Sequence, residues 1–362
     1  MKWVCLLLAS LVLMTLLGCQ NVDVQPAKKE ESYTTNELAT EQFIRSHLLT
    51  KEGLIQTDVQ KRANVFLSES LGLWMLYLVD SGREEEFAQQ VTLLQDHFLD
   101  PSSLVYWEIN EGKPSKVNAW IDDARIMRAL YKAAHIFDHP EYIEMAKDIG
   151  ESLNDYAFTQ KWPVDYVDIP SKAKSNVLTI SYLDSEALDI LQKLHIRSSK
   201  DSNSLRKWVQ SIPVQNGFYP KSFNMKSKAF HYDEEINLID QLYVAYHLEQ
   251  ANISTDHFAK WINQEFQKEK KLVGRYHFET KIRSVTYESP AVYSLAVLYS
   301  VEREEKEQVL QYYQAMKNLS VQNKEHSEYG GYIDISQQQT HSFDNLLPLL
   351  AERTLLNERY IR

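Results

Sequence analysis

A helix-opening segment occurs six times along the chain. It first spans Leu67 to Met75, where a serine and a glutamate precede a run of apolar residues. Altered copies, each followed by a largely apolar stretch, begin at Ile121, Ser181, Tyr232, Tyr287 and Ser342. The copies lie roughly 50 to 60 residues apart, and a self-similar period of this length is typical of repeat proteins. One interval can hold two helices and two loops, so each repeat is expected to be a helical hairpin.

A second helix is predicted inside every interval. Amphipathic stretches, with apolar residues near positions i, i+3, i+4 and i+7, cover residues 37–48, 84–97, 141–156, 203–210, 255–266 and 303–316. The helices that follow the recurring segment are more apolar, and residues 238–246 are apolar on most sides, as suits a helix buried between neighbours. The pattern predicts an all-α fold, an (α/α)6 toroid of six helical hairpins with six inner helices inside six outer ones and a carboxylate at its mouth.

The beginning of the chain resembles a bacterial export signal. Lys2 precedes an apolar stretch over residues 4–17, and Leu16-Leu17-Gly18-Cys19 resembles the lipobox of bacterial lipoproteins. The resemblance implies that residues 1–18 are a signal peptide and that a lipid on Cys19 anchors the protein to the extracytoplasmic face of the cell membrane. An uncleaved anchor helix is the alternative, but the apolar stretch is short for a membrane span.

The rest of the chain divides into a tether and one folded domain. Residues 19–35 are polar and charged and show no apolar periodicity, which is typical of a flexible linker. Residues 36–362 contain no second break in composition and are predicted to form a single domain, whose length suits a ring-shaped core. No sequence feature requires a dimer.

Charge and cysteine content argue against several classes of function. The net charge is −11, and no stripe of lysine and arginine offsets it, so nucleic acid and anionic lipid surfaces are not expected as partners. Cys5 lies in the predicted signal and Cys19 is predicted to be lipidated, which leaves no thiol for disulfides, cysteine catalysis or zinc. The histidines lack the H-x-x-H and H-E-x-x-H spacings, so neither a metal site nor a cofactor is predicted.

Several short segments resemble, in the same order, the motifs of one known family. Ser68 to Met75 is similar to the motif S-E-G-x-G-Y-G-M, and Leu104 to Trp107 is similar to L-x-x-W. Asp122 to Ile126 resembles D-A-D-L-x-I. Gly217 to Pro220, followed by Tyr232-Asp233, resembles G-L-x-P-D followed by Y-D-A-I-R. These are motifs of the family 8 glycoside hydrolases, bacterial endoglucanases, chitosanases and xylanases built on an (α/α)6 toroid, and the resemblance implies the same fold.

The resemblance also implies roles for acidic residues. The glutamate of S-E-G is the family's general acid and corresponds to Glu69, while the aspartate of Y-D-A is its general base and corresponds to Asp233. An aspartate of D-x-D orients the sugar and the attacking water; it corresponds to Asp123, or to Asp122 because the register is ambiguous by one residue. An inverting hydrolase keeps its acid and base about 6.5–9.5 Å apart so that water fits between sugar and base. Each of these residues could instead cap a helix or interact with its dipole.

Further residues near the predicted mouth are candidates for substrate contact. Trp107 matches the family pattern, and Tyr232 precedes the candidate base. Asp184 and Glu288 occupy corresponding helix starts, where capping is the alternative role. Gly72 lies inside a predicted helix, at a cost of about 1 kcal/mol, which indicates close packing or close approach of the substrate.

The resemblance implies a membrane-anchored glycoside hydrolase that cleaves an extracellular polysaccharide, a β-1,4-glucan or a chitosan-like polymer, by an inverting two-carboxylate mechanism. Two alternatives stay open. A catalytically decayed polysaccharide-binding lipoprotein is favoured by departures from the family motifs at Ser70, Ile121 and Ile236. A different (α/α)6 enzyme, such as a polysaccharide lyase or an unsaturated-uronide hydrolase, would use other residues of the inner helices.

Overall fold

The computed structural model describes residues 38–159 and 162–362, which lie within one compact unit, Tyr33–Arg362. The predicted signal peptide over residues 1–18, the predicted lipidation of Cys19 and the predicted tether over residues 19–35 lie outside the described residues. Within the described ranges, no helix is both long and apolar enough to span a membrane.

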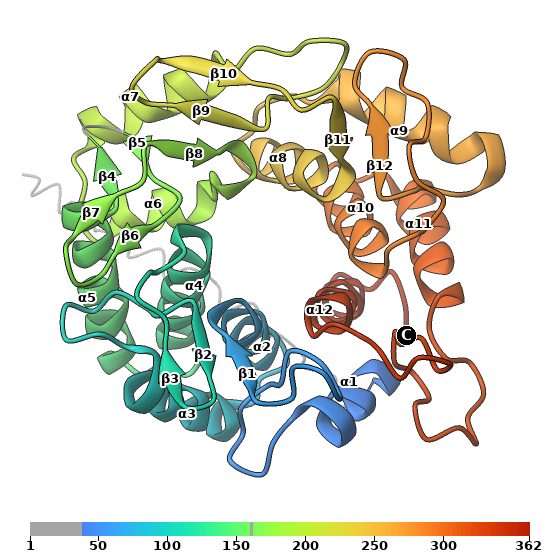
Figure 1. Cartoon of the computed structure of the whole chain (residues 1–362), viewed down its shortest axis with the longest axis horizontal. Helices are drawn as coiled ribbons and strands as arrows, with labels where there is room; N and C mark the ends of the chain where they lie inside the picture. The colour runs from blue at the N-terminus through green and yellow to red at the C-terminus, as the bar shows by residue number, and fades with distance from the viewer. Residues whose placement is uncertain (1–37, 160–161) are drawn as a thin grey trace, which may run out of the picture. The chain divides into compact units, whose positions relative to one another are not determined.

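The helices of this unit form a closed ring (Figure 1). The inner helices are α2 (Ser68–Asp80), α4 (Trp120–Ile136), α6 (Ser185–Lys193), α8 (Leu238–Gln250), α10 (Pro290–Glu302) and α12 (Phe343–Asn357). Each inner helix contacts the next, and α12 contacts α2. The outer helices are α1 (Ala39–Phe43) with η1 (Ile44–Leu48), α3 (Glu84–Leu93) with η2 (Leu94–Phe98), α5 (Glu141–Tyr156), α7 (Ser199–Gln210), α9 (Asp256–Glu269) and α11 (Lys306–Asn318). The predicted all-α toroid of six helical hairpins is confirmed.

The inner helices are apolar because they have neighbours on several sides. In α10, every residue from Ala291 to Ser300 is buried, and this helix packs against α8, α11 and α12. Outer and inner helices alternate along the chain, so all inner helices run in the same direction and begin at the same end of the ring. We call this end the mouth.

Short antiparallel strands connect the helices. One sheet contains β1 (Val65–Leu67), β2 (Glu108–Asn110) and β3 (Lys113–Pro114), and a second contains β8 (Val177–Thr179), β9 (Ser222–Asn224) and β10 (Ala229–His231). Two-stranded ribbons pair β4 (Phe158–Thr159) with β5 (Trp162–Pro163), β6 (Val167–Asp168) with β7 (Ala173–Lys174), and β11 (Glu235–Asn237) with β12 (Arg275–His277). The strand β1 leads directly into α2, β11 leads into α8, and a short turn, η3 (Ile180–Tyr182), precedes α6. Strand pairing therefore positions the beginnings of inner helices at the mouth.

Helix α8 begins later than the repeat pattern predicted. The copy of the recurring segment at Tyr232 precedes β11, and the helix starts only after that strand. Pairing with β12 holds β11 extended, and the side chain of Asn237 caps the helix by accepting the backbone N–H of Ile239 at 3.0 Å. The first turn of α8 therefore contains Asp240, whereas Asp233 lies before β11.

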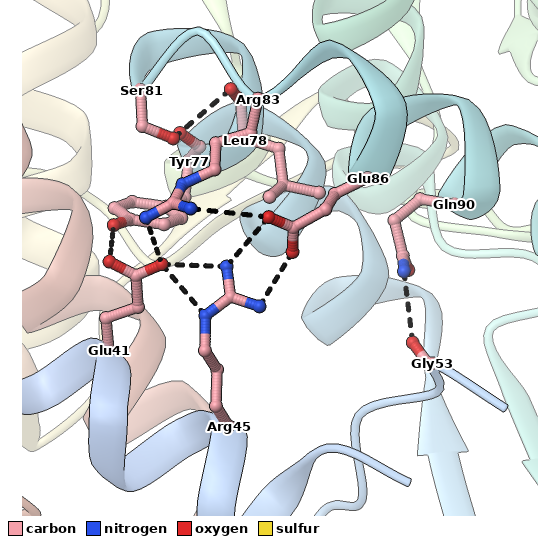
Figure 2. A network of polar contacts seen from close by, with 9 residues as sticks. All are labelled: Glu41, Arg45, Gly53, Tyr77, Leu78, Ser81, Arg83, Glu86 and Gln90. Carbon is pink, nitrogen blue, oxygen red and sulfur yellow. Dashed lines mark hydrogen bonds and ion pairs between the residues drawn. The ribbon is translucent and has the colours of Figure 1, made fainter. Parts of the chain in front are cut away.

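A buried ion-pair network fastens α1 to the ring (Figure 2). The side chain of Glu41 on α1 has no exposed surface, and its carboxylate pairs with Arg45 at 2.7 Å and with Arg83 at 3.0 Å. The hydroxyl of Tyr77 on α2 donates a further hydrogen bond to it. Both arginines also pair with Glu86 of α3. The network joins the first outer helix to the hairpin formed by α2 and α3.

Candidate active site

Two carboxyl groups from neighbouring inner helices lie together at the mouth. Glu69 is the second residue of α2, and Asp122 is the third residue of α4. The hydroxyl of Ser68 donates a hydrogen bond to Asp122 at 2.8 Å. The backbone N–H of Ser68 donates to the carbonyl oxygen of Trp107 at 3.0 Å. These contacts tie the beginning of α2 both to α4 and to the loop that leads into β2.

Burial and neighbouring charges change the protonation of this pair. Burial raises the pKa of Glu69 to about 7, and the negative charge of Asp122 adds to the rise. Burial also raises the pKa of Asp122, but there a 2.8 Å ion pair with Arg125 and the hydrogen bond from Ser68 act in the opposite direction. A carboxyl group that keeps its proton close to neutral pH can act as a general acid.

Activity is expected to fall as the pH rises through about 7 if Glu69 supplies the proton. Below this pKa the carboxyl group is protonated and can donate, whereas above it the group is a carboxylate and cannot. Initial rates at low polymer concentration, measured between about pH 5 and about pH 9, give the profile of kcat/KM. A profile without a fall on the alkaline side would contradict the assignment of Glu69 as the acid.

A pocket of about 410 Å³ opens beside Glu69. The ring of Tyr287 lines it, together with the polar side chains of Glu288, His341 and Asp344. A second pocket, of about 700 Å³, shares these three polar residues and adjoins the first. Volumes of this order are typical of ligand sites, and the two pockets form one hollow that leads to Glu69.

Asp344, the second residue of α12, is a third carboxyl group in this hollow, and its role was not foreseen from the sequence. Burial raises its pKa, and Ser289 donates a hydrogen bond to it at 3.3 Å. The negative charge of Asp344 contributes to the raised pKa of Glu69. The first and last inner helices of the ring thus meet at the same site.

Asp240 on α8 is another acidic residue of the mouth that sequence reasoning missed. Its side chain is 15% exposed, forms an ion pair with Lys221 and accepts a hydrogen bond from the hydroxyl of Ser181 at 2.7 Å. A signal was present in the sequence, because Ile239-Asp240 repeats the earlier pair Ile121-Asp122. Both pairs occupy the second and third positions of an inner helix.

The hydroxyl group of Tyr182 lies near carboxyl groups on three inner helices. Burial raises the pKa of its hydroxyl group. The negative charges of Asp122, Asp240 and Glu69 raise this pKa further. The side chain of Tyr182, in the turn η3 before α6, is therefore affected by the negative charges of carboxylates on α2, α4 and α8.

The candidate base from the sequence, Asp233, is not brought together with these groups. Its side chain is 40% exposed and forms an ion pair with His231 at 3.2 Å. The hydroxyl of the neighbouring Tyr232 donates to the carbonyl oxygen of Pro213 at 2.9 Å. Asp233 and Tyr232 lie before β11, outside the first turn of α8, where Asp240 lies.

Asp122 and Asp123, which the sequence could not distinguish, have different surroundings. Asp123 is fully buried, and its carboxylate accepts hydrogen bonds from the backbone N–H of Val105 at 3.2 Å and from the side chain of Asn118 at 3.1 Å. Asp123 therefore holds the loops that precede α4, whereas Asp122 lies next to Glu69. Trp107 stands in the adjoining loop with 36% of its surface exposed.

Asp184 and Glu288 also differ in their placement. Asp184 is buried, caps α6 by accepting the backbone N–H of Ala187 at 2.9 Å, and pairs with Arg128 inside the ring. Glu288 lines the hollow at the mouth and pairs with Lys271 at 3.3 Å. Among the described residues, no cluster of three or more potential metal ligands occurs.

One sequence relative covers most of the chain. A protein of Bacillus subtilis (strain 168) named "Putative lipoprotein YdaJ" is 43% identical over 323 residues, which are 89% of this chain and 88% of the relative. No protein-family model matches the chain.

Several solved structures share the ring. An α-amylase from Clostridium perfringens is 26% identical, with a TM-score of 0.80 over 87% of this chain and 95% of its own. PssZ from Listeria monocytogenes is also 26% identical, with a TM-score of 0.74 over 88% of this chain and 96% of its own. Endoglucanase Cel10 from Klebsiella pneumoniae, a family 8 glycosyl hydrolase, is 15% identical, with a TM-score of 0.61 over 90% of this chain and 99% of its own. The fold implied by the family 8 resemblance is confirmed.

Proposed function

The chain belongs to the same family as YdaJ of Bacillus subtilis and has the fold of family 8 glycoside hydrolases, and on this premise we propose that it hydrolyses an extracellular polysaccharide. The main support for the proposal is the carboxyl group of Glu69, whose pKa is raised to about 7 and which lines the hollow at the mouth. A glycosidase needs such a protonated acid beside the leaving oxygen. The α-amylase and the endoglucanase among the solved structures support the same class of reaction.

In the proposed reaction, Glu69 donates its proton to the glycosidic oxygen as the bond to the anomeric carbon breaks. A carboxylate on a facing inner helix accepts a proton from water, whose oxygen attacks that carbon from the opposite face and inverts its configuration. We assign this base to Asp240, because it lies in the first turn of α8, where Asp233 does not. Asp122 orients the sugar. Glu69 ends as a carboxylate and Asp240 as an acid, and proton exchange with solvent restores both.

The proposed location is the outer face of the cell membrane, with a lipid on Cys19 as the anchor. The lipobox-like Leu16 to Cys19 and the name of the Bacillus subtilis relative support this location. Residues 19–35 would give the enzyme its reach from the membrane. Incorporation of labelled palmitate that persisted in Cys19→Ser would argue against the anchor.

Two classes of polymer are candidates for the substrate. A β-1,4-glucan or chitosan-like polymer follows from the family 8 resemblance. An α-glucan is the second candidate, because the α-amylase has a higher TM-score with this chain, 0.80, than the family 8 endoglucanase, 0.61. Both linkages need an acid beside the leaving oxygen and a base on the opposite face, so an α-linked and a β-linked sugar would have to bind with opposite faces toward Glu69.

Release of reducing ends from soluble β-1,4-glucan, chitosan and starch tests the proposal. The unit Tyr33–Arg362 is incubated with each polymer, and products are followed by reducing-sugar assay and ultraviolet absorbance. We expect new reducing ends from at least one polymer, without the absorbance of an unsaturated uronic acid. Unsaturated products would identify a lyase, and binding without cleavage would favour the decayed polysaccharide-binding protein.

Asp240→Asn is expected to lower kcat by roughly 10²- to 10⁴-fold, because asparagine cannot accept the proton of the attacking water. Asp233→Asn is the matched control, since it makes the same change on the neighbouring exposed loop, and its kcat is expected to stay close to that of the unmodified protein. Both are measured with saturating polymer. If the loss occurred in Asp233→Asn instead, Asp233 would be the base.

A further inference from the structure

Arg125 of α4 lies buried beneath the mouth. Its Nη1 atom donates a hydrogen bond to Oδ1 of Asp122 at 2.8 Å, one turn earlier in the same helix. Its positive charge also acts on Glu69 of α2 and on Tyr243 of α8. The guanidinium group of Arg125 therefore interacts with side chains of three inner helices beside the candidate acid, Glu69.

The aliphatic part of Arg125 packs against α2 at Gly72. A Cβ atom at position 72 would lie 3.2 Å from Cδ of Arg125 and 3.2 Å from Cγ1 of Ile126. Such contacts are closer than ordinary van der Waals contact, so even the methyl group of alanine would push the stem of Arg125 by a few tenths of an ångström. Close packing was one of the two explanations expected for a glycine inside this helix, and the structure identifies Arg125 as a packing partner.

Arg125 also lines a cavity inside the ring. This cavity of about 470 Å³, which Tyr243 lines too, reaches the last residues of α2 and α10. Arg128, the next arginine of α4, lines the same cavity and pairs with Asp184 and Glu186. Arg128 thus has acidic partners of its own, whereas Arg125 is paired with Asp122 at the mouth.

Arg125 is a cation that pairs directly with Asp122 and whose charge also acts on Glu69. The charged and titratable side chains that act on the arginine or on its partners are Glu69, Asp122, Arg128, Asp165, Tyr182, Asp184, Asp240, Tyr243, His247 and Asp344. Burial raises the pKa of both tyrosines and lowers the pKa of the histidine, so these three are neutral at neutral pH. The remaining groups are acidic except Arg128, and α10 contributes Leu295, Leu298 and Glu302 to the cavity.

We propose that Arg125 is a positioning residue that decides which carboxyl group of the Glu69–Asp122 pair carries the proton, an inference that rests on the proposed function. Two adjacent, desolvated carboxyl groups cannot both be charged without a large cost, so they share one proton. The guanidinium group stabilises negative charge on Asp122, with which it is in contact. The proton is therefore held on Glu69, which makes Glu69 the donor and keeps Asp122 as the carboxylate that orients the sugar.

Carbon-13 NMR titration of side-chain carboxyl groups in the full-length protein tests this assignment without any substrate. The signals of the two groups are identified by their loss in Glu69→Gln and Asp122→Asn. In the unmodified protein, we expect Glu69 alone to titrate near pH 7. In Arg125→Gln, we expect both groups to titrate together, with the midpoint raised by about one pH unit, because no cation opposes protonation. An unchanged titration in Arg125→Gln would overturn the proposal.

Two variants separate positioning from a general loss of stability. Arg128→Gln removes a comparably buried cation from the same helix, so it is expected to lower Tm and to leave the titration of Glu69 unchanged. Arg125→Lys keeps the charge, so Glu69 is expected to titrate alone again, close to its original midpoint. A shift in Arg128→Gln equal to that in Arg125→Gln would overturn the proposal, because the effect would then not belong to Arg125.

Gly72→Ala gives an independent test if Arg125→Gln does not fold. Alanine is the better helix former, so this variant is expected to fold, while its Cβ atom displaces the stem of Arg125. The titration of Glu69 should shift upward by a small fraction of the shift in Arg125→Gln, and a downward shift would overturn the proposal. Because none of these titrations needs turnover, failure to cleave any polymer would count against the proposed function alone.

Discussion

Glu69→Gln is expected to reduce kcat/KM on the cleaved polymer by roughly 10²- to 10⁴-fold, the range that general acid catalysis contributes. Glutamine occupies the same space at the mouth but has no acidic proton for the leaving oxygen. The loss should appear in kcat with KM little changed, because proton donation takes place in the transition state. Rates over a series of polymer concentrations separate the two constants.

The matched control for this variant is Glu85→Gln, which makes the same exchange at an exposed position in the first turn of α3. Its activity should equal that of the unmodified protein. The Tm of Glu69→Gln should not fall, since the exchange replaces a desolvated acid with a neutral group of similar size. A Glu69→Gln variant that kept more than about a tenth of the activity would remove Glu69 from the role of general acid.

Glu41→Gln is expected to lower the free energy of unfolding by about 1–3 kcal/mol, the usual cost of leaving buried hydrogen-bonding groups without their partner. Glu41 has no exposed side-chain surface and accepts a hydrogen bond from Tyr77, and its loss would leave Arg45 and Arg83 with Glu86 as their shared partner (Figure 2). Urea unfolding followed by circular dichroism gives the change. Hydrogen exchange should show the first loss of protection in α1, because the network fastens this helix to the ring.

The control within the same network is Glu86→Gln. The side chain of Glu86 is 30% exposed, so its ion pairs are screened by solvent and its loss is expected to cost less than about 1 kcal/mol. Equal and small effects of the two variants would show that burial does not set the strength of this network. The ring would then owe its closure to apolar packing alone.

The fold could be predicted because its main feature is repeated and local. Each repeat contains a polar outer helix and an apolar inner one, and burial between neighbours explains why helices such as α10 have few polar residues. Glu69 could be placed at the mouth for the same reason, since Ser68 and Glu69 open an inner helix. Its raised pKa could not be predicted, because that depends on Asp122 and Asp344 from distant parts of the chain.

The start of α8 was predicted wrongly because it depends on a contact between distant segments. A match to Tyr-Asp favoured a helix from Tyr232, but pairing of β11 with β12 keeps the chain extended there. The apolar run over residues 238–246 and the Ile-Asp pair at positions 239 and 240, which repeats the start of α4, pointed to the correct register. The sequence could not distinguish Asp122 from Asp123 for a similar reason. Hydrogen bonds from loops outside α4 hold Asp123, whereas Asp122 is the residue next to Glu69.

The anomeric configuration of the first product shows whether Glu69 and Asp240 act as acid and base. Proton NMR recorded during cleavage distinguishes the new α and β reducing ends before they interconvert. We expect inversion, because Glu69 on α2 and Asp240 on α8 would act from opposite faces of the sugar with water between sugar and base. Retention of configuration would contradict it, since a retaining enzyme needs a nucleophilic carboxylate that forms a covalent bond with the sugar.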